Sequence, residues 1–76
     1  MIKLIFSIRN QLLALVIKGK EIFCTDKNNR IPKKYIPETE EDKIELDNAK
    51  SEEELSIICE KHCKKIGSIL LKKEII

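Results

Sequence analysis

Hydrophobic and polar residues alternate at the start of the chain. Between residues 2 and 8, the apolar side chains of Ile2, Leu4 and Phe6 occupy every second position. A period of two residues is typical of a β-strand with one buried face. The pattern therefore predicts a first strand over residues 2–8.

Two more strands are expected directly after it. Residues 12–18 are apolar at almost every position, which predicts a central strand covered on both faces, with a helix over residues 9–17 as the alternative. Residues 21–25 follow a tight turn in which Gly19 can adopt a positive φ. The first third of the chain is therefore predicted to be a β-meander.

One segment carries the signals of a helix at both ends and along one face. Ser51 and Glu54 have the spacing of a capping box, in which each side chain accepts a hydrogen bond from the backbone N–H of the other residue. Gly67 stands where a helix ends in a left-handed residue. The pattern predicts an amphipathic helix over residues 51–67. Its apolar face comprises Leu55, Ile58, Cys59, His62, Cys63 and Ile66.

The rest of the chain is less regular. Residues 26–42 are predicted to form a long loop that changes from basic to acidic. Residues 43–47 predict a short strand, with a helical turn from Glu40 as the alternative. Residues 68–76 are apolar and β-branched with two lysines, which favours a last edge strand over a continuation of the helix.

The order of these elements predicts one small α+β domain over residues 1–76. Its antiparallel or mixed sheet would consist of the N-terminal meander and the C-terminal edge strand, with one amphipathic helix packed across one face. A chain of 76 residues with 42% hydrophobic residues, 37% charged residues and a net charge of +2 has the composition of a folded domain.

Composition also limits the function. A domain of this size has little room for a deep cleft and carries no catalytic signature, so we expect a protein that is not an enzyme and needs no cofactor. It has no apolar run long enough for a membrane span or a signal peptide. Together with three cysteines, an odd number, this predicts a cytoplasmic location in its own cell or a host cell.

Cysteine and histidine form the most specific chemical pattern in the sequence. Zinc could bind Cys24 together with Cys59, His62 and Cys63, since the last three lie on one side of the predicted helix. The spacing matches no zinc-finger pattern, so packing in the core is the favoured interpretation and no metal is expected. Neighbouring helix residues diverge by about 100°, which disfavours His62 as a base for a Cys63 nucleophile.

Charge is segregated along the sequence. Basic residues predominate between residues 18 and 35, and acidic residues predominate between residues 38 and 54. The basic segment could contact a phosphate backbone, with a tyrosine for stacking on bases. This alternative function, nucleic-acid binding, would use Lys27, Arg30, Lys33, Lys34 and Tyr35.

The favoured function is protein–protein interaction by a small binding or regulatory module. Glu40, Glu41 and Asp42 could contact a basic surface on a partner protein. Ile75 belongs to apolar surface of the predicted edge strand that a single helix cannot cover. An edge strand with exposed apolar side chains favours a homodimer or a docked partner. The sequence therefore predicts a macromolecular partner, with a protein favoured over a nucleic acid, and no membrane.

Overall fold

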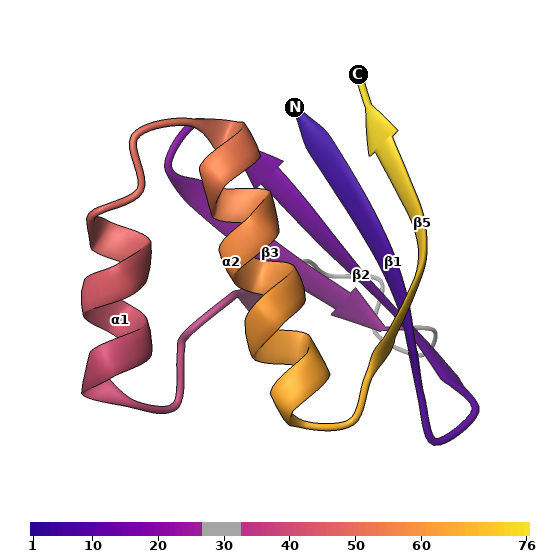
Figure 1. Ribbon diagram of the computed structural model, residues 1–76. Helices are drawn as coiled ribbons and strands as arrows, with labels where there is room; N and C mark the ends of the chain where they lie inside the picture. The colour runs from indigo at the N-terminus through magenta and orange to yellow at the C-terminus, as the bar shows by residue number, and fades with distance from the viewer. Residues whose placement is uncertain (27–32) are drawn as a thin grey trace.

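In the part of the chain that the structure describes, five antiparallel strands form one sheet, and two helices cover one of its faces (Figure 1). The structure is a computed structural model that describes residues 1–26 and 33–76. The strands lie in the order β4-β3-β2-β1-β5. They are β1 (Ile2–Ile8), β2 (Gln11–Lys18), β3 (Glu21–Asp26), β4 (Lys33–Lys34) and β5 (Ile69–Ile75), and the helices are α1 (Glu40–Asp47) and α2 (Glu52–Lys65). The predicted α+β class is confirmed.

Two tight hairpins build the predicted meander. β1 pairs with β2 up to Ile8 opposite Gln11, and the turn residues Arg9 and Asn10 have φ values of 48° and 64°. Positive φ at both central positions gives a turn whose twist matches that of the flanking strands. Gly19 in the second turn has φ 63°, as its position in the sequence predicts. The alternative helix over residues 9–17 is not formed.

The hydrophobic core lies between the helices and the face of the sheet that they cover. In β1, Leu4 and Phe6 point into it and are almost fully buried, whereas Ile8 at the end of the strand is only half-buried. The other buried core residues are Ile2, Leu15, Ile17, Ile22, Leu46, Ala49, Leu55, Cys59 and Cys63. The predicted alternation of β1 thus corresponds to the observed burial.

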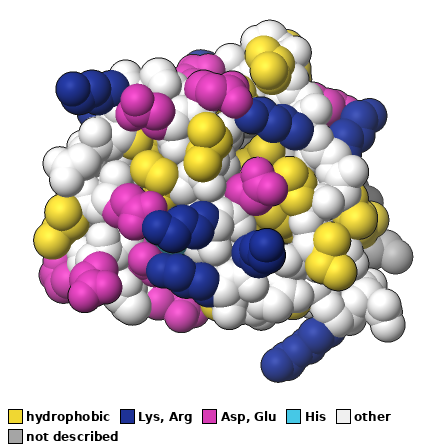
Figure 2. All heavy atoms as spheres, in the orientation of Figure 1, with side chains coloured by type: hydrophobic (Ala, Val, Ile, Leu, Met, Phe, Trp, Pro, Cys, Tyr) yellow, Lys and Arg dark blue, Asp and Glu magenta, His cyan; other side chains and the backbone are white. Residues whose placement is uncertain are grey.

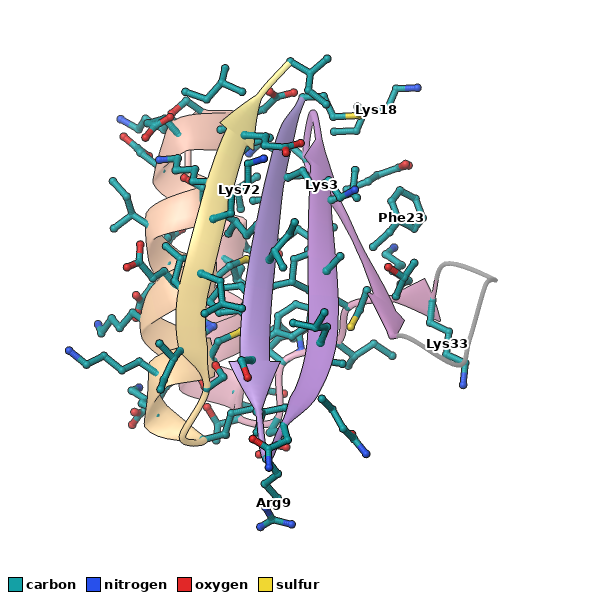
Figure 3. The ribbon with its side chains drawn as sticks, turned by 90° about the vertical axis from the view of Figure 1, so that its right-hand side faces the viewer. Lys3, Arg9, Lys18, Phe23, Lys33 and Lys72 are labelled. Atoms are coloured by element: carbon teal, nitrogen blue, oxygen red, sulfur yellow. The ribbon has the colours of Figure 1, made fainter. Side chains whose placement is uncertain are left out.

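No helix of the described residues covers the other face of the sheet (Figure 3). The prediction that residues 12–18 are covered on both faces is therefore wrong. On this strand Leu15 and Ile17 are buried, whereas Val16 is half-buried and Leu12 is exposed. The reason is that both helices pack on the same side of the sheet, so β2 is central in the sheet but open on one face.

The caps of α2 are mostly as predicted. The Ser51 hydroxyl accepts a hydrogen bond of 3.2 Å from the Glu54 N–H, and Gly67 has φ 86°. The Glu54 carboxylate, however, accepts from the N–H of Lys50 at 2.7 Å rather than from Ser51. Ile66, predicted on the apolar face, is 55% exposed because the helix ends before it.

The short strand predicted over residues 43–47 is wrong, because this segment belongs to helix α1. Thr39 caps the helix by accepting a hydrogen bond from the Asp42 N–H at 3.2 Å. Glu40, Glu41 and Asp42 place negative charge in its first turn, where the helix dipole favours it. The helical alternative from Glu40 is therefore the correct one, and the loop predicted to end at residue 42 is shorter.

β5 is an edge strand, as predicted. It pairs with β1 from Ile2 opposite Ile75 to Ser7 opposite Ile69, with a bulge between Ile5 and Phe6. β1 and β5 come from opposite ends of the chain and lie side by side (Figure 1). β5 therefore carries one outer edge of the sheet, and β4 carries the other.

Candidate functional site

The outer edge of β5 combines a strand at the end of the sheet with exposed apolar side chains. Ile69, Leu71 and Ile75 are 66%, 56% and 73% exposed, and Ile76 beyond the strand is 71% exposed. Figure 2 shows hydrophobic side chains on the side of the molecule where β5 lies. Ile75, singled out in the sequence, is therefore at the surface of an edge strand.

Ion pairs fix the charged residues of this strand. The Lys72 ammonium lies 2.8 Å from the Glu74 carboxylate, and Lys73 bonds to Glu53 of α2. The hydrogen bond and charge of Glu74 raise the pKa of Lys72, and those of Lys72 lower the pKa of Glu74. Lys73 therefore ties the strand to the helix layer, whereas Lys72 and Glu74 form a charge pair along β5.

The acidic residues singled out in the sequence lie in different environments. Glu40 and Glu41 are exposed in the first turn of α1. The Asp42 carboxylate instead lies 3.2 Å from Nε2 of His62 and 3.5 Å from Nζ of Lys65. Desolvation alone would raise the pKa of Asp42, but the His62, Thr39 and Lys65 groups outweigh it and lower that pKa. Asp42 therefore joins α1 to α2.

The basic segment is described in part. Lys27 and Arg30 lie outside the described residues, whereas Lys33 and Lys34 form the short, exposed strand β4. Tyr35 is half-buried next to the core, and desolvation raises its pKa to about 12.

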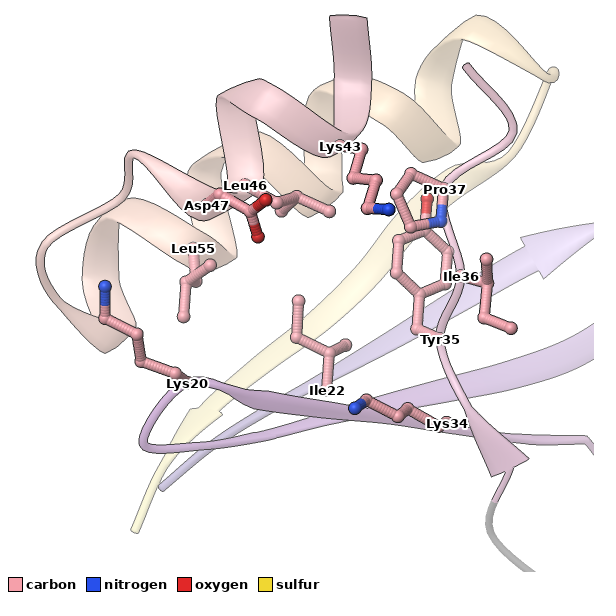
Figure 4. Close-up of a pocket in the computed structure, with 10 residues that line it drawn as sticks. All are labelled: Lys20, Ile22, Lys34, Tyr35, Ile36, Pro37, Lys43, Leu46, Asp47 and Leu55. Carbon is pink, nitrogen blue, oxygen red and sulfur yellow. The ribbon is translucent and has the colours of Figure 1, made fainter. Parts of the chain in front are cut away.

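A cavity of about 330 Å³ lies between β3, α1 and the segment after β4 (Figure 4). Its apolar walls come from Ile22, Leu46 and Leu55, and Tyr35 closes one end. Three lysines also line it, namely Lys20, Lys34 and Lys43. The Lys20 ammonium donates to the Ala49 carbonyl at 3.1 Å. Cavities of this size hold small ligands, and the three lysines outnumber the one carboxylate in the lining, that of Asp47, which favours an anionic ligand.

The cavity could not be recognised from the sequence. Lys34 and Tyr35 belong to the predicted basic segment, but Lys20, Lys43 and Asp47 come from other parts of the chain. Only the docking of α1 brings Lys43 and Asp47 to the cavity, and residues 43–47 were expected to form a strand.

The cysteines are arranged for packing. Cys59 and Cys63 are buried in the core and Cys24 packs against it. Burial raises the pKa of the Cys59 thiol to about 12 and also raises that of Cys63, although a Ser68 hydrogen bond opposes the second shift. The ligand atoms of the zinc set Cys24, Cys59, His62 and Cys63 do not converge on one point in the described part of the chain. In the described part of the chain, the residues grouped with His62 as possible metal ligands are carboxylates.

Comparisons of the chain with protein-family models, with curated proteins and with solved structures find no match. Neither helix in the described part of the chain is long and apolar enough to cross a membrane.

Proposed function

We propose that this protein is a non-enzymatic binding module that pairs with another polypeptide along the outer edge of β5. The observation that supports the proposal is the gathering of exposed Ile69, Leu71 and Ile75 on a strand that ends the sheet. An edge strand offers backbone N–H and C=O groups to an added strand, and alternate side chains give the contact its specificity.

A second copy of the chain is the first partner to consider, because β5 is complementary to itself. If two β5 strands pair antiparallel about Lys73, Leu71 of each strand lies opposite Ile75 of the other. The same register places Lys72 opposite Glu74, and each of these residues already has an opposite charge beside it. Apolar and oppositely charged cross-strand pairs stabilise antiparallel sheets. The two Lys73 side chains would face each other, but each is neutralised by its own Glu53.

The acidic residues have a secondary role in this proposal. Glu40 and Glu41 are exposed and lie away from the core, so they are free to attract a basic surface on a partner protein. Such long-range attraction changes the rate of association more than the final affinity.

The test is a pair of substitutions, Leu71→Lys with Ile75→Lys. Burying each apolar side chain at an interface contributes about 1.5–3 kcal/mol. The dissociation constant of the dimer should therefore rise about 100-fold or more. Sedimentation equilibrium over a wide concentration range measures this change. Both positions are exposed, so the monomer should keep its fold by circular dichroism.

Ile36→Lys with Ile44→Lys is the matched control, because these residues are also exposed but lie outside β5. The control should associate as the wild type does. If the wild type stays monomeric, a displayed library of extended peptides tests for a different partner chain. Failure to select any peptide that depends on Leu71 and Ile75 would then contradict the proposal.

A second candidate function, binding of single-stranded nucleic acid, is favoured by the three lysines and Tyr35 around the cavity. Lys34→Glu with Lys43→Glu should weaken the binding of a fluorescent oligonucleotide about tenfold or more and reduce its salt dependence. Arg9→Glu with Lys64→Glu, at two exposed positions away from the cavity, is the control. Equal losses from both pairs would show that only the net charge matters, and this candidate would then be rejected.

A further inference from the structure

Three potential metal ligands from two helices converge in the described part of the chain. Asp42 and Glu45 lie one turn apart on α1, and His62 faces them from α2. One ligand atom of each residue lies within 4.8 Å of the other two. Oδ1 of Asp42 and Nε2 of His62 are 3.2 Å apart. Two ligands of a tetrahedral zinc ion are separated by about 3.3 Å when each bond is about 2.0–2.1 Å long.

The state of His62 distinguishes this group from an ordinary cluster of acidic residues. Its side chain is 3% exposed. Nε2 contacts the Asp42 carboxylate without forming a well-aligned hydrogen bond, and Nδ1 has no hydrogen bond within the described residues. Leaving a buried polar atom such as Nδ1 without a hydrogen bond is costly. An imidazole nitrogen next to two carboxylates is a normal arrangement for a metal ion.

We propose that Asp42, Glu45 and His62 bind a divalent transition-metal ion of the zinc type. One imidazole and two carboxylates suit Zn²⁺ and similar ions, whereas Ca²⁺ and Mg²⁺ take oxygen ligands almost exclusively. Water would complete the coordination, because Asp42 and His62 also line an open pocket of about 290 Å³.

Two lysines hold the carboxylates when no metal is present. Nζ of Lys61 lies 3.3 Å from Glu45, and Nζ of Lys65 lies 3.5 Å from Asp42. Both lysine side chains are more than half exposed, so they can turn into solvent when an ion enters. The lysines therefore compete with the metal, and removing one should strengthen metal binding.

The consequence for the fold is a metal-dependent attachment of α1. Within α1 the buried residue is Leu46, and the helix packs on α2. Ligands on both helices would bind the ion only when α1 is docked, so the metal stabilises the docked state by linkage.

The experiment uses the full chain, stripped of metal, and titrates it with Zn²⁺ by calorimetry. We expect one saturable site per chain. At a free Zn²⁺ concentration about 100 times Kd, Tm should rise by roughly 10 °C or more. Asp42→Asn and Glu45→Gln should each weaken binding about tenfold or more, whereas the neighbouring Glu41→Gln and Asp47→Asn should bind as the wild type does.

Two further measurements keep the proposal open to contradiction. Lys61→Gln should tighten Zn²⁺ binding several-fold, whereas Lys64→Gln should leave it unchanged. Co²⁺ should bind without a thiolate-to-cobalt charge-transfer band. A thiolate band would assign the metal to the cysteines instead, and the absence of saturable binding, or equal losses in the ligand and control variants, would overturn the proposal.

Discussion

Phe6→Ala should lower the free energy of unfolding by about 3–5 kcal/mol, the usual cost of removing a buried phenylalanine side chain. Phe6 is 1% exposed and lies between Leu13 of β2 and Leu70 of β5. A domain of this size has only a few kcal/mol of net stability, so the variant should be largely unfolded at 25 °C. Urea titration followed by circular dichroism checks this result.

Ile5→Ala on the opposite face of β1 is the matched control. Ile5 is half-buried and points to the face of the sheet that the helices leave open. Removing the Ile5 side chain should lower the free energy of unfolding by less than half as much as removing that of Phe6, because fewer neighbours surround Ile5. Similar costs at the two positions would mean that the outer face of the sheet is also covered, in contradiction to the arrangement in Figure 3.

Leu46→Ala should release α1 from the rest of the domain while the sheet stays folded. Removing a buried leucine costs about 2–5 kcal/mol, and α1 has no other buried residue between Glu40 and Asp47. Hydrogen exchange should show that amides of residues 40–47 lose their protection, whereas those of β1 and β2 keep theirs.

Ile44→Ala, on the same helix but 55% exposed, should change the stability of α1 by no more than about 0.5 kcal/mol. If Leu46→Ala lowers the protection of β1 and β2 as strongly as that of α1, the helix unfolds together with the sheet. The docking of α1 would then not be a separate step.

Local signals explain what the sequence predicts well. The alternation in β1, the glycine after β2 and the caps of α2 each depend on neighbours within a few residues. These features were enough to predict β1, β2 and β3, the helix α2 and the final strand after Gly67. The same reasoning could not show that both helices pack on one face, because that depends on contacts between distant elements.

The sequence offered α1 only as the alternative to a strand, for a different physical reason. Ile44 and Leu46 are two residues apart and fit a short strand as well as a helix, and two apolar residues cannot distinguish the periods. The deciding signal was the Thr39 cap followed by three acidic residues. With that helix in place, Asp42 and Glu45 would fall on one face three residues apart, but their approach to His62 could not be derived from spacing alone.

The pairing of β1 with β5 has a consequence for synthesis of the protein. β1 and β2 can pair soon after they leave the ribosome, but the second edge of β1 stays open until residues 69–75 emerge. Translating the roughly 60 residues between β1 and β5 takes several seconds at about 5–20 residues per second. During that interval an apolar strand edge is exposed on the nascent chain. Slower translation should therefore increase its capture by chaperones, or its aggregation, without changing the finished fold.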